Sequence, residues 1–197
     1  SFPSSWSFWT FCSSESVASL DAAIDAGLHE LAAEAVLPLQ EARRQRVLMA
    51  IDASGGTPCV IDDVEAELES VDEGVHLLVP HAVAADARRM RVVALQTETP
   101  MVAVCREPET DAGLVPIVAI GGVTVRAYVD PPEDPSAPSM EWTLAALEAL
   151  GDAAIERIDP AASGPDRISG LRNALESIPE HEKLHQALAA ALRAAAG

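Results

Sequence analysis

Lysine is nearly absent from this chain, and cysteine and aromatic residues are scarce. Lys183 is the sole lysine among 13 basic residues, which stand against 31 acidic residues and leave a net charge of −18. A surface this acidic repels both the phosphate backbone of nucleic acids and anionic lipid headgroups. The composition therefore excludes nucleic acid as an expected partner and argues against contact with a membrane surface.

Only three cysteines are present, Cys12, Cys59 and Cys105, and no two of them have CxxC spacing. An odd number of scattered thiols predicts reduced cysteines in a cytoplasmic compartment rather than a disulfide framework. We expect Cys59 and Cys105 to behave as small buried hydrophobes. No apolar run approaches the roughly 20 residues that cross a bilayer, so we expect no transmembrane segment. The N-terminus lacks the basic region of a signal peptide.

The few aromatic residues are concentrated at the N-terminus. Five of the seven lie within residues 1–15, a segment that carries no basic residue: Phe2, Trp6, Phe8, Trp9 and Phe11. Each such side chain buries about 150–250 Å², so their exposure to water would promote aggregation. We expect this aromatic arm either to fold back on its own domain or to insert into another subunit or partner, with contact at a membrane interface as a lesser alternative.

The remaining sequence predicts one α+β domain with N-terminal helices. Hydrophobic residues make up 49% of the chain and are mostly aliphatic. Apolar spacing predicts helices over 16–53, broken or kinked at Pro38, with Arg43, Arg44 and Arg46 on the outer side. A capping pattern at Asp62 predicts a short acidic helix after that.

A central antiparallel β-meander of about four to five strands is expected next. Apolar runs at 75–79, 90–96, 101–106, 114–120 and 123–130 predict the strands, and Gly121-Gly122 predicts a hairpin. Alternation in the last run leaves Arg126 and Tyr128 on a solvated face.

The expected domain organisation follows from these patterns. The core spans 16–130, four prolines make 131–138 a stiff connector, and 139–197 forms C-terminal helices that pack on the core. Pro179 is expected to begin the last helix, whose apolar stripe includes Leu184 and Leu188.

His181-Glu182-Lys183-Leu184-His185 matches HExxH and resembles the zinc-binding helix of zincin metallopeptidases. The resemblance implies that His181 and His185 ligate Zn²⁺ and that Glu182 is the general base. The pattern covers five residues, and the twelve residues after His185 contain no further ligand type, so a third ligand has to come from upstream, for example His76 or His81. The alternative interpretation is a solvated helix start, where the acidic residues interact favourably with the helix dipole.

Three functions remain open from the sequence. The first is a non-catalytic interaction or assembly subunit that docks on a protein partner or on its own copies through the aromatic arm and the face around Arg126 and Tyr128. The second is a small ligand-binding sensory domain, and the third is a zinc hydrolase built on His181, Glu182 and His185. The absence of a complete catalytic constellation favours a protein that is not an enzyme.

Overall fold

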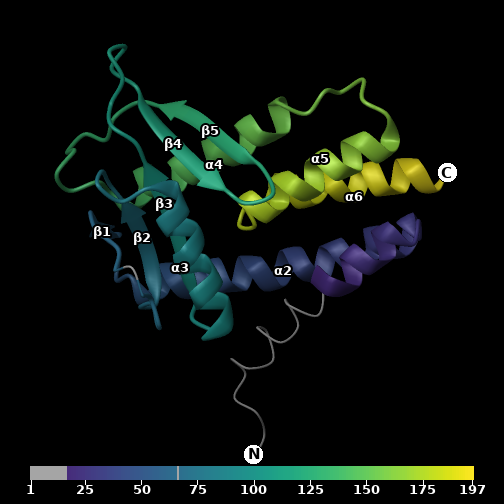
Figure 1. Ribbon diagram of the computed structural model, residues 1–197, viewed down its shortest axis with the longest axis horizontal. Helices are drawn as coiled ribbons and strands as arrows, with labels where there is room; N and C mark the ends of the chain where they lie inside the picture. Colours follow the sequence, from purple (N-terminus) through teal and green to yellow (C-terminus); the bar gives the residue numbers. More distant parts are fainter. Residues whose placement is uncertain (1–16, 66) are drawn as a thin grey trace, which may run out of the picture.

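The computed structural model describes residues 17–65 and 67–197, which form a five-stranded sheet with helices on both faces (Figure 1). Residues 17–25 are helical and precede the elements α2 (His29–Ala53), β1 (Cys59–Ile61), β2 (Gly74–Leu78), α3 (Ala84–Gln96), β3 (Met101–Arg106), β4 (Val115–Ile120), β5 (Thr124–Val129), α4 (Met140–Glu156), α5 (Gly164–Ser177) and α6 (Glu182–Ala196). The aromatic arm lies outside the described residues.

The sheet is mixed, with strand order β1-β2-β3-β4-β5. The β1–β2 and β2–β3 pairs are parallel, whereas β3–β4 and β4–β5 are antiparallel. The α+β class is confirmed, but the prediction of a purely antiparallel meander is wrong. Helix α3 makes the difference, because it carries the chain back between β2 and β3 so that the two strands run the same way.

The strand predicted over 90–96 is wrong, since these residues form the second half of α3. Its buried positions include Ala87, Met90 and Ala94, whose spacing of three and four residues defines one helix face. The adjacent Val92 and Val93 favoured a strand locally. Alanine, arginine and methionine elsewhere in the helix are stronger helix formers, and packing of the buried face decides the outcome.

The acidic helix predicted from Asp62 is also wrong. After β1 the described residues up to 73 form bends and irregular structure. Every charged side chain in this stretch is acidic, and pairs such as Glu65 and Glu69 would lie four residues apart on a helix. Like charges at that spacing repel each other and destabilise a helix. Val64, Leu68 and Val71 instead pack individually against the cluster beneath α3.

The predicted β4–β5 hairpin is confirmed. In β5, Val125 and Ala127 are buried while Arg126 and Tyr128 are exposed, as the alternation predicts. Gly121 is required here because a Cβ atom on it would lie 2.5 Å from Cα of Ser177. The hairpin tip therefore rests directly on the end of α5.

The N-terminal helices break at Gly27 and not at Pro38. Gly27 has φ +70°, a left-handed conformation that ends the first helix, whereas Pro38 lies inside the continuous helix α2. The break rotates the following residues, so Leu28 and Leu31 are exposed instead of sharing the buried face of Leu20.

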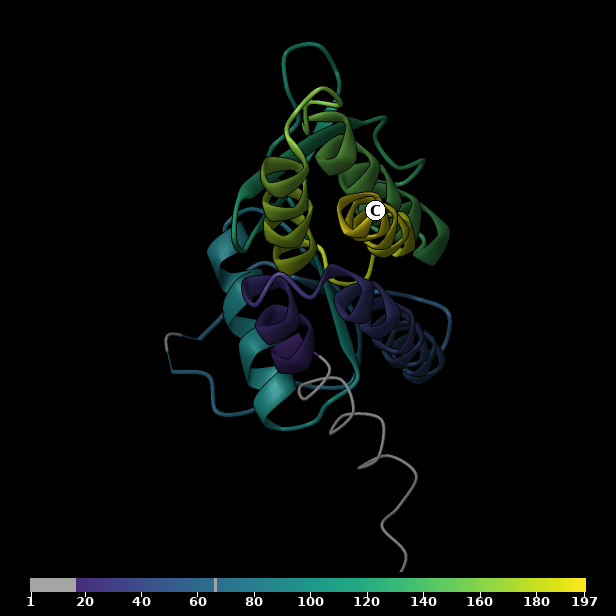
Figure 2. The same ribbon diagram turned by 90° about the vertical axis from the view of Figure 1, so that its right-hand side faces the viewer.

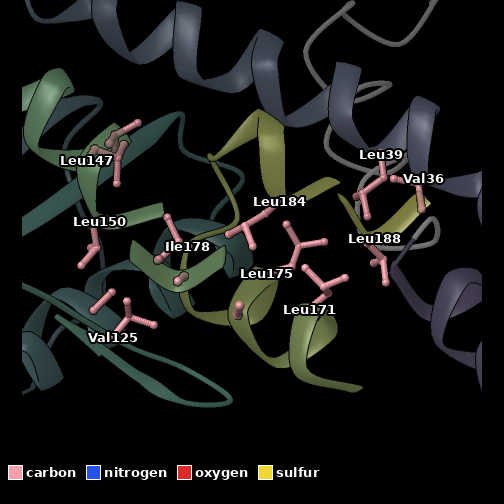
Figure 3. Close-up of a cluster of buried hydrophobic side chains, with 14 of the residues drawn as sticks. Val36, Leu39, Val125, Leu147, Leu150, Leu171, Leu175, Ile178, Leu184 and Leu188 are labelled. Atoms are coloured by element: carbon pink, nitrogen blue, oxygen red, sulfur yellow. The ribbon is translucent and has the colours of Figure 1, made fainter. Parts of the chain in front are cut away.

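On the face of the sheet opposite α3, α4 packs on the strands, and α6 packs on α2, α5 and α4. Helix α4 runs through Gly151 without interruption, and α6 begins at Glu182 rather than at Pro179. Figure 2 shows α6 end-on, with α5 beside it and α2 below it. In Figure 3, Leu184 and Leu188 of α6 lie among leucines of α5 and α2, and both are fully buried. Among the described helices, none has the length and hydropathy needed to cross a membrane.

Candidate functional site: a cleft lined by arginines

A cleft of about 520 Å³ opens between α2 and α3, at the end of the sheet where β3 begins and β4 ends. This volume lies within the range of small-molecule sites, about 300–1,000 Å³. Its lining comes from both helices, from the start of the first helix and from the connection between α5 and α6: Val17, Arg43, Arg46, Val47, Arg88, Arg91, Val92, Ala94, Leu95, Gln96, Glu98, Met101, Ile120, Glu176, Pro179 and Glu180.

Four arginines line this cleft, two from each helix. Arg43 and Arg46 are three residues apart on α2, and Arg88 and Arg91 have the same spacing on α3. Residues three apart share a helix face, so each helix presents a pair of guanidinium groups to the cleft. The prediction that Arg43 and Arg46 decorate an outer surface is therefore wrong.

The arginine that follows the first member of each pair points elsewhere and has an acidic partner. On α2, Arg44 Nε lies 3.0 Å from Glu41 Oε2, and on α3, Arg89 Nη2 lies 2.7 Å from Asp86 Oδ1. Both partners precede their arginine by three residues on the same helix. On each helix, therefore, one arginine forms an ion pair on the helix surface, and two other arginines line the cleft.

Two of the cleft arginines are anchored by backbone carbonyls. Arg46 Nη2 donates to the carbonyl oxygen of Thr99 at 2.8 Å, and Arg91 Nη2 donates to that of Ile120 at 2.8 Å. A carbonyl orients a guanidinium without neutralising it. These contacts hold two guanidinium groups at the end of the sheet, where both line the cleft.

Arg88 is the most exposed of the four. Its Nη2 lies 3.8 Å from Glu176 Oε1, and both side chains are about half exposed, at 52% and 58%. An ion pair this long and this accessible to water contributes little to stability. Arg88 is therefore positioned to exchange its contact with Glu176 for a contact with a bound anion.

Arg43 lies at the deepest point of the arginine set, next to His185 of α6. Its Nη1 is 3.2 Å from His185 Nε2, and His185 Nδ1 is 2.9 Å from the carbonyl oxygen of His181. A carbonyl only accepts, so Nδ1 carries the proton and Nε2 accepts from the guanidinium. Burial, followed by the charge of Arg43, lowers the pKa of His185 to about 3, so this imidazole is neutral.

Burial also lowers the pKa of Arg43 to about 10 and lowers the pKa of Arg46. The carboxylate of Glu180 acts in the opposite direction on both, but does not offset the loss of hydration. Glu180 Oε2 is itself buried and has no hydrogen-bond partner among the described residues. Burial thus disfavours the charged form of both arginines more than the carboxylate of Glu180 favours it.

Between the charges the cleft wall is apolar. Val47 of α2, Val92 and Leu95 of α3 and Met101 of β3 contribute hydrocarbon surface, and Leu95 is 55% exposed. A ligand that fills this space needs an apolar body as well as an anionic group. The described lining thus combines guanidinium groups with hydrocarbon surface.

The HExxH residues do not converge on one point. His185 uses Nε2 and Nδ1 in the contacts above, while Glu182 is exposed in the first turn of α6. His181 is buried and faces Glu148 and Asp152 of α4. Among the described residues, these three form the group of possible metal ligands that lie within reach of one another, and His185 does not belong to it.

The other candidate residues are distributed over the molecule. Arg126 forms a bidentate ion pair with Glu107, with an Nη2–Oε1 distance of 2.7 Å, and Tyr128 is 57% exposed beside it on the face of the hairpin. Cys105 is buried, which raises the pKa of its thiol to about 12, whereas Cys59 is exposed in β1, contrary to expectation. The five aromatic residues of the arm lie outside the described residues.

A repeated pattern in the sequence points to the cleft. Residues 41–46 read Glu-Ala-Arg-Arg-Gln-Arg, and residues 86–91 read Asp-Ala-Arg-Arg-Met-Arg. In each copy the acidic residue pairs with the second arginine, and the first and third arginines line the cleft. The strand predicted at 90–96 conceals the helical spacing of the second copy, which lies within α3.

Comparison with protein families, with curated proteins and with solved structures finds no match to this chain.

Proposed function

We propose that this protein is a non-catalytic binding module whose cleft takes a small amphipathic anion, with a carboxylate or phosphate head and a hydrocarbon body. One observation carries the proposal. In a chain of net charge −18, four arginines meet in one cleft that also has apolar walls. The net charge of the chain is negative, but the cleft gathers several guanidinium groups. Such a local group of cations is suited to recognising an anion.

The arrangement of the arginines supports a head group at the inner end of the cleft. Arg43 and Arg46 are the cations that lose most hydration, since burial lowers the pKa of both. A bound anion would restore the interaction that water provides to an exposed guanidinium. The apolar side chains of Val92 and Leu95 on α3 then face the body of the ligand.

The second proposed function is docking, in which the aromatic arm binds a protein partner or a second copy of the chain. Val17, the first described residue, lines the cleft. Apolar and aromatic side chains are suited to such a cleft, and arginines interact favourably with aromatic rings. The cytoplasmic location and the lack of nucleic-acid partners remain proposals that rest on composition.

Titration of the full chain with decyl phosphate and with decanoate, each below its micelle concentration, tests the main proposal. Calorimetry should show saturable binding of one or both anions, with decanol as the uncharged control. Arg88→Gln should weaken binding roughly 10- to 150-fold, the loss expected for one charge-assisted hydrogen bond of about 1.5–3 kcal/mol. Arg46→Gln should have an effect of the same kind from the opposite helix.

The neighbouring arginines supply matched controls. Arg89→Gln on α3 and Arg44→Gln on α2 remove the same charge from the same helices, one or two residues away, but outside the cleft. Equal losses in the cleft and control variants would contradict the proposal. A chain that lacks residues 1–15 separates the two functions, because tighter anion binding after truncation would identify the arm as an occupant of the cleft.

A further inference from the structure

A second cluster of charged groups lies on the other side of α6, and we infer that it is a binding site for a divalent transition metal such as Zn²⁺, with His181, Glu148 and Asp152 as ligands. Glu148 and Asp152 are four residues apart on α4 and share one helix face. His181 is the N-cap residue that immediately precedes α6. The site uses α4, and it differs from the HExxH arrangement, in which His185 would be a ligand.

The ring of His181 is buried and aimed at the two carboxylates. The side chain has no exposed surface, and neither ring nitrogen has a hydrogen-bond partner among the described residues. Its Nε2 lies 3.3 Å from Glu148 Oε2 and 3.3 Å from Asp152 Oδ1. A buried polar group without a hydrogen bond is destabilising unless another interaction replaces the lost water.

The distances fit a metal ion between these atoms. Zn²⁺ binds imidazole nitrogen and carboxylate oxygen at about 2.0–2.2 Å, which places tetrahedral ligands about 3.3–3.6 Å from one another. The Nε2–Oε2 and Nε2–Oδ1 distances of 3.3 Å already match this value. Glu148 and Asp152 are about half exposed, so the fourth position is open to water.

The backbone of α4 is shaped around the histidine ring. Gly151 lies between the two carboxylate residues, and a Cβ atom on it would lie 2.1 Å from His181 Cγ. Glycine in the interior of a helix is destabilising relative to alanine. Here its lack of a side chain lets the ring approach the helix and reach the carboxylates.

Lys183 shows that the same place attracts a cation. Its Nζ lies 2.8 Å from Glu148 Oε1 and 2.9 Å from both carboxylate oxygens of Asp152. The ammonium thus binds Oε1 of Glu148, while Oε2 of that residue faces His181. An ammonium so close to the site repels a dication, so Lys183 limits the affinity for the metal.

Titration of chelator-treated full chain with Zn²⁺ tests this assignment by calorimetry and by the side-chain ¹⁵N shifts of histidine. We expect one Zn²⁺ per chain and a large shift of His181 Nε2. Glu148→Gln and Asp152→Asn should each weaken binding at least tenfold, and Lys183→Met should strengthen it several-fold. Glu182→Gln is the matched control, because this exposed carboxylate is adjacent to His181 in sequence but outside the cluster.

Other outcomes would overturn the assignment. Zn²⁺ binding that is lost in His185→Gln but retained in Glu148→Gln would assign the metal to the HExxH pair instead. Mg²⁺ or Ca²⁺ binding as tight as that of Zn²⁺ would remove His181 as a ligand, since these ions prefer oxygen. Lys183→Met removes the ammonium that repels a dication. If this variant shows no saturable binding of Zn²⁺, the assignment is wrong and the cluster is a set of ion pairs.

Discussion

The arginine cleft and the cluster around His181 lie on two sides of the start of α6, and they have opposite charge patterns. In the cleft, four guanidinium groups meet three carboxylates, those of Glu98, Glu176 and Glu180. In the cluster, two carboxylates of α4 meet one ammonium and one histidine. His185 contacts both regions, through the guanidinium of Arg43 on one side and the carbonyl of His181 on the other.

Each region contains one buried polar group without a hydrogen bond among the described residues. In the cleft it is Glu180 Oε2, and in the cluster it is the ring of His181. Their surroundings differ in sign, since arginines line the cleft beside Glu180 whereas two carboxylates face the ring of His181. Net charge predicts neither, because a total of −18 describes the average surface and not the local arrangement.

The largest expected effect comes from removing the apolar packing that both regions share. Leu188 of α6 is fully buried between α2 and α5. Leu188→Ala should lower the free energy of unfolding by about 2–5 kcal/mol, because it removes buried hydrocarbon and leaves a cavity. Chemical denaturation measures this loss.

Leu37→Ala is the control for this prediction. At a position on α2 that is 66% exposed, it should change the free energy of unfolding by less than about 0.5 kcal/mol. Equal losses would mean that α6 does not pack as described.

Acid should destabilise the contact between the two regions. The pKa of His185 is about 3 in the folded chain and about 6.5 when exposed, so the unfolded state takes up a proton first as the pH falls. The neutral ring of His185 makes its full contribution to the free energy of unfolding above about pH 6.5. This contribution is lost as the pH falls towards 3. Between pH 7 and pH 5 this loss is about 2 kcal/mol.

His185→Gln isolates this contribution from that of the acidic residues. Denaturation curves at several pH values should show a shallower loss of stability for the variant between pH 7 and pH 5 than for the wild-type chain. Parallel curves for the two proteins would show that His185 is not held neutral by burial and by Arg43.

The smallest expected effect concerns two neighbouring arginines of α3, of which Arg89 should contribute more to stability and Arg88 more to ligand binding. Arg89→Gln removes the ion pair with Asp86 and should lower stability by about 0.3–1 kcal/mol, while Arg88→Gln should change it by less than about 0.3 kcal/mol. For ligand affinity we expect the reverse order, with a larger loss for Arg88→Gln than for Arg89→Gln. Thermal denaturation without ligand measures the stability difference, and a larger loss for Arg88→Gln would identify that residue as structural.

The sequence predicts those elements whose pattern is local and strong. The β4–β5 hairpin follows from Gly121-Gly122 and the alternation up to Tyr128, and the buried stripe of α6 follows from the leucines at 184 and 188. These features depend on residues close together in the chain, so spacing is enough to find them.

The parallel half of the sheet and both candidate sites depend on contacts between distant segments. Val92-Val93 favours a strand until the packing of α3 is known, and a strand over 90–96 would separate Arg91 from the helix face that it shares with Arg88. The pairing of Glu148 with His181 joins positions 33 residues apart, on helices whose contact no local pattern encodes. The HExxH pattern identified His181 but suggested a different partner.

A two-ligand NMR titration of the full chain tests most directly whether the two regions bind ligands of opposite charge. Backbone amide shifts are followed during addition of decyl phosphate and, separately, of Zn²⁺. We expect decyl phosphate to shift amides of α2 and α3 around the arginine pairs, and Zn²⁺ to shift amides of α4 around Gly151 and of the start of α6. Anion-induced shifts centred on α4, or zinc-induced shifts centred on the cleft, would contradict the account.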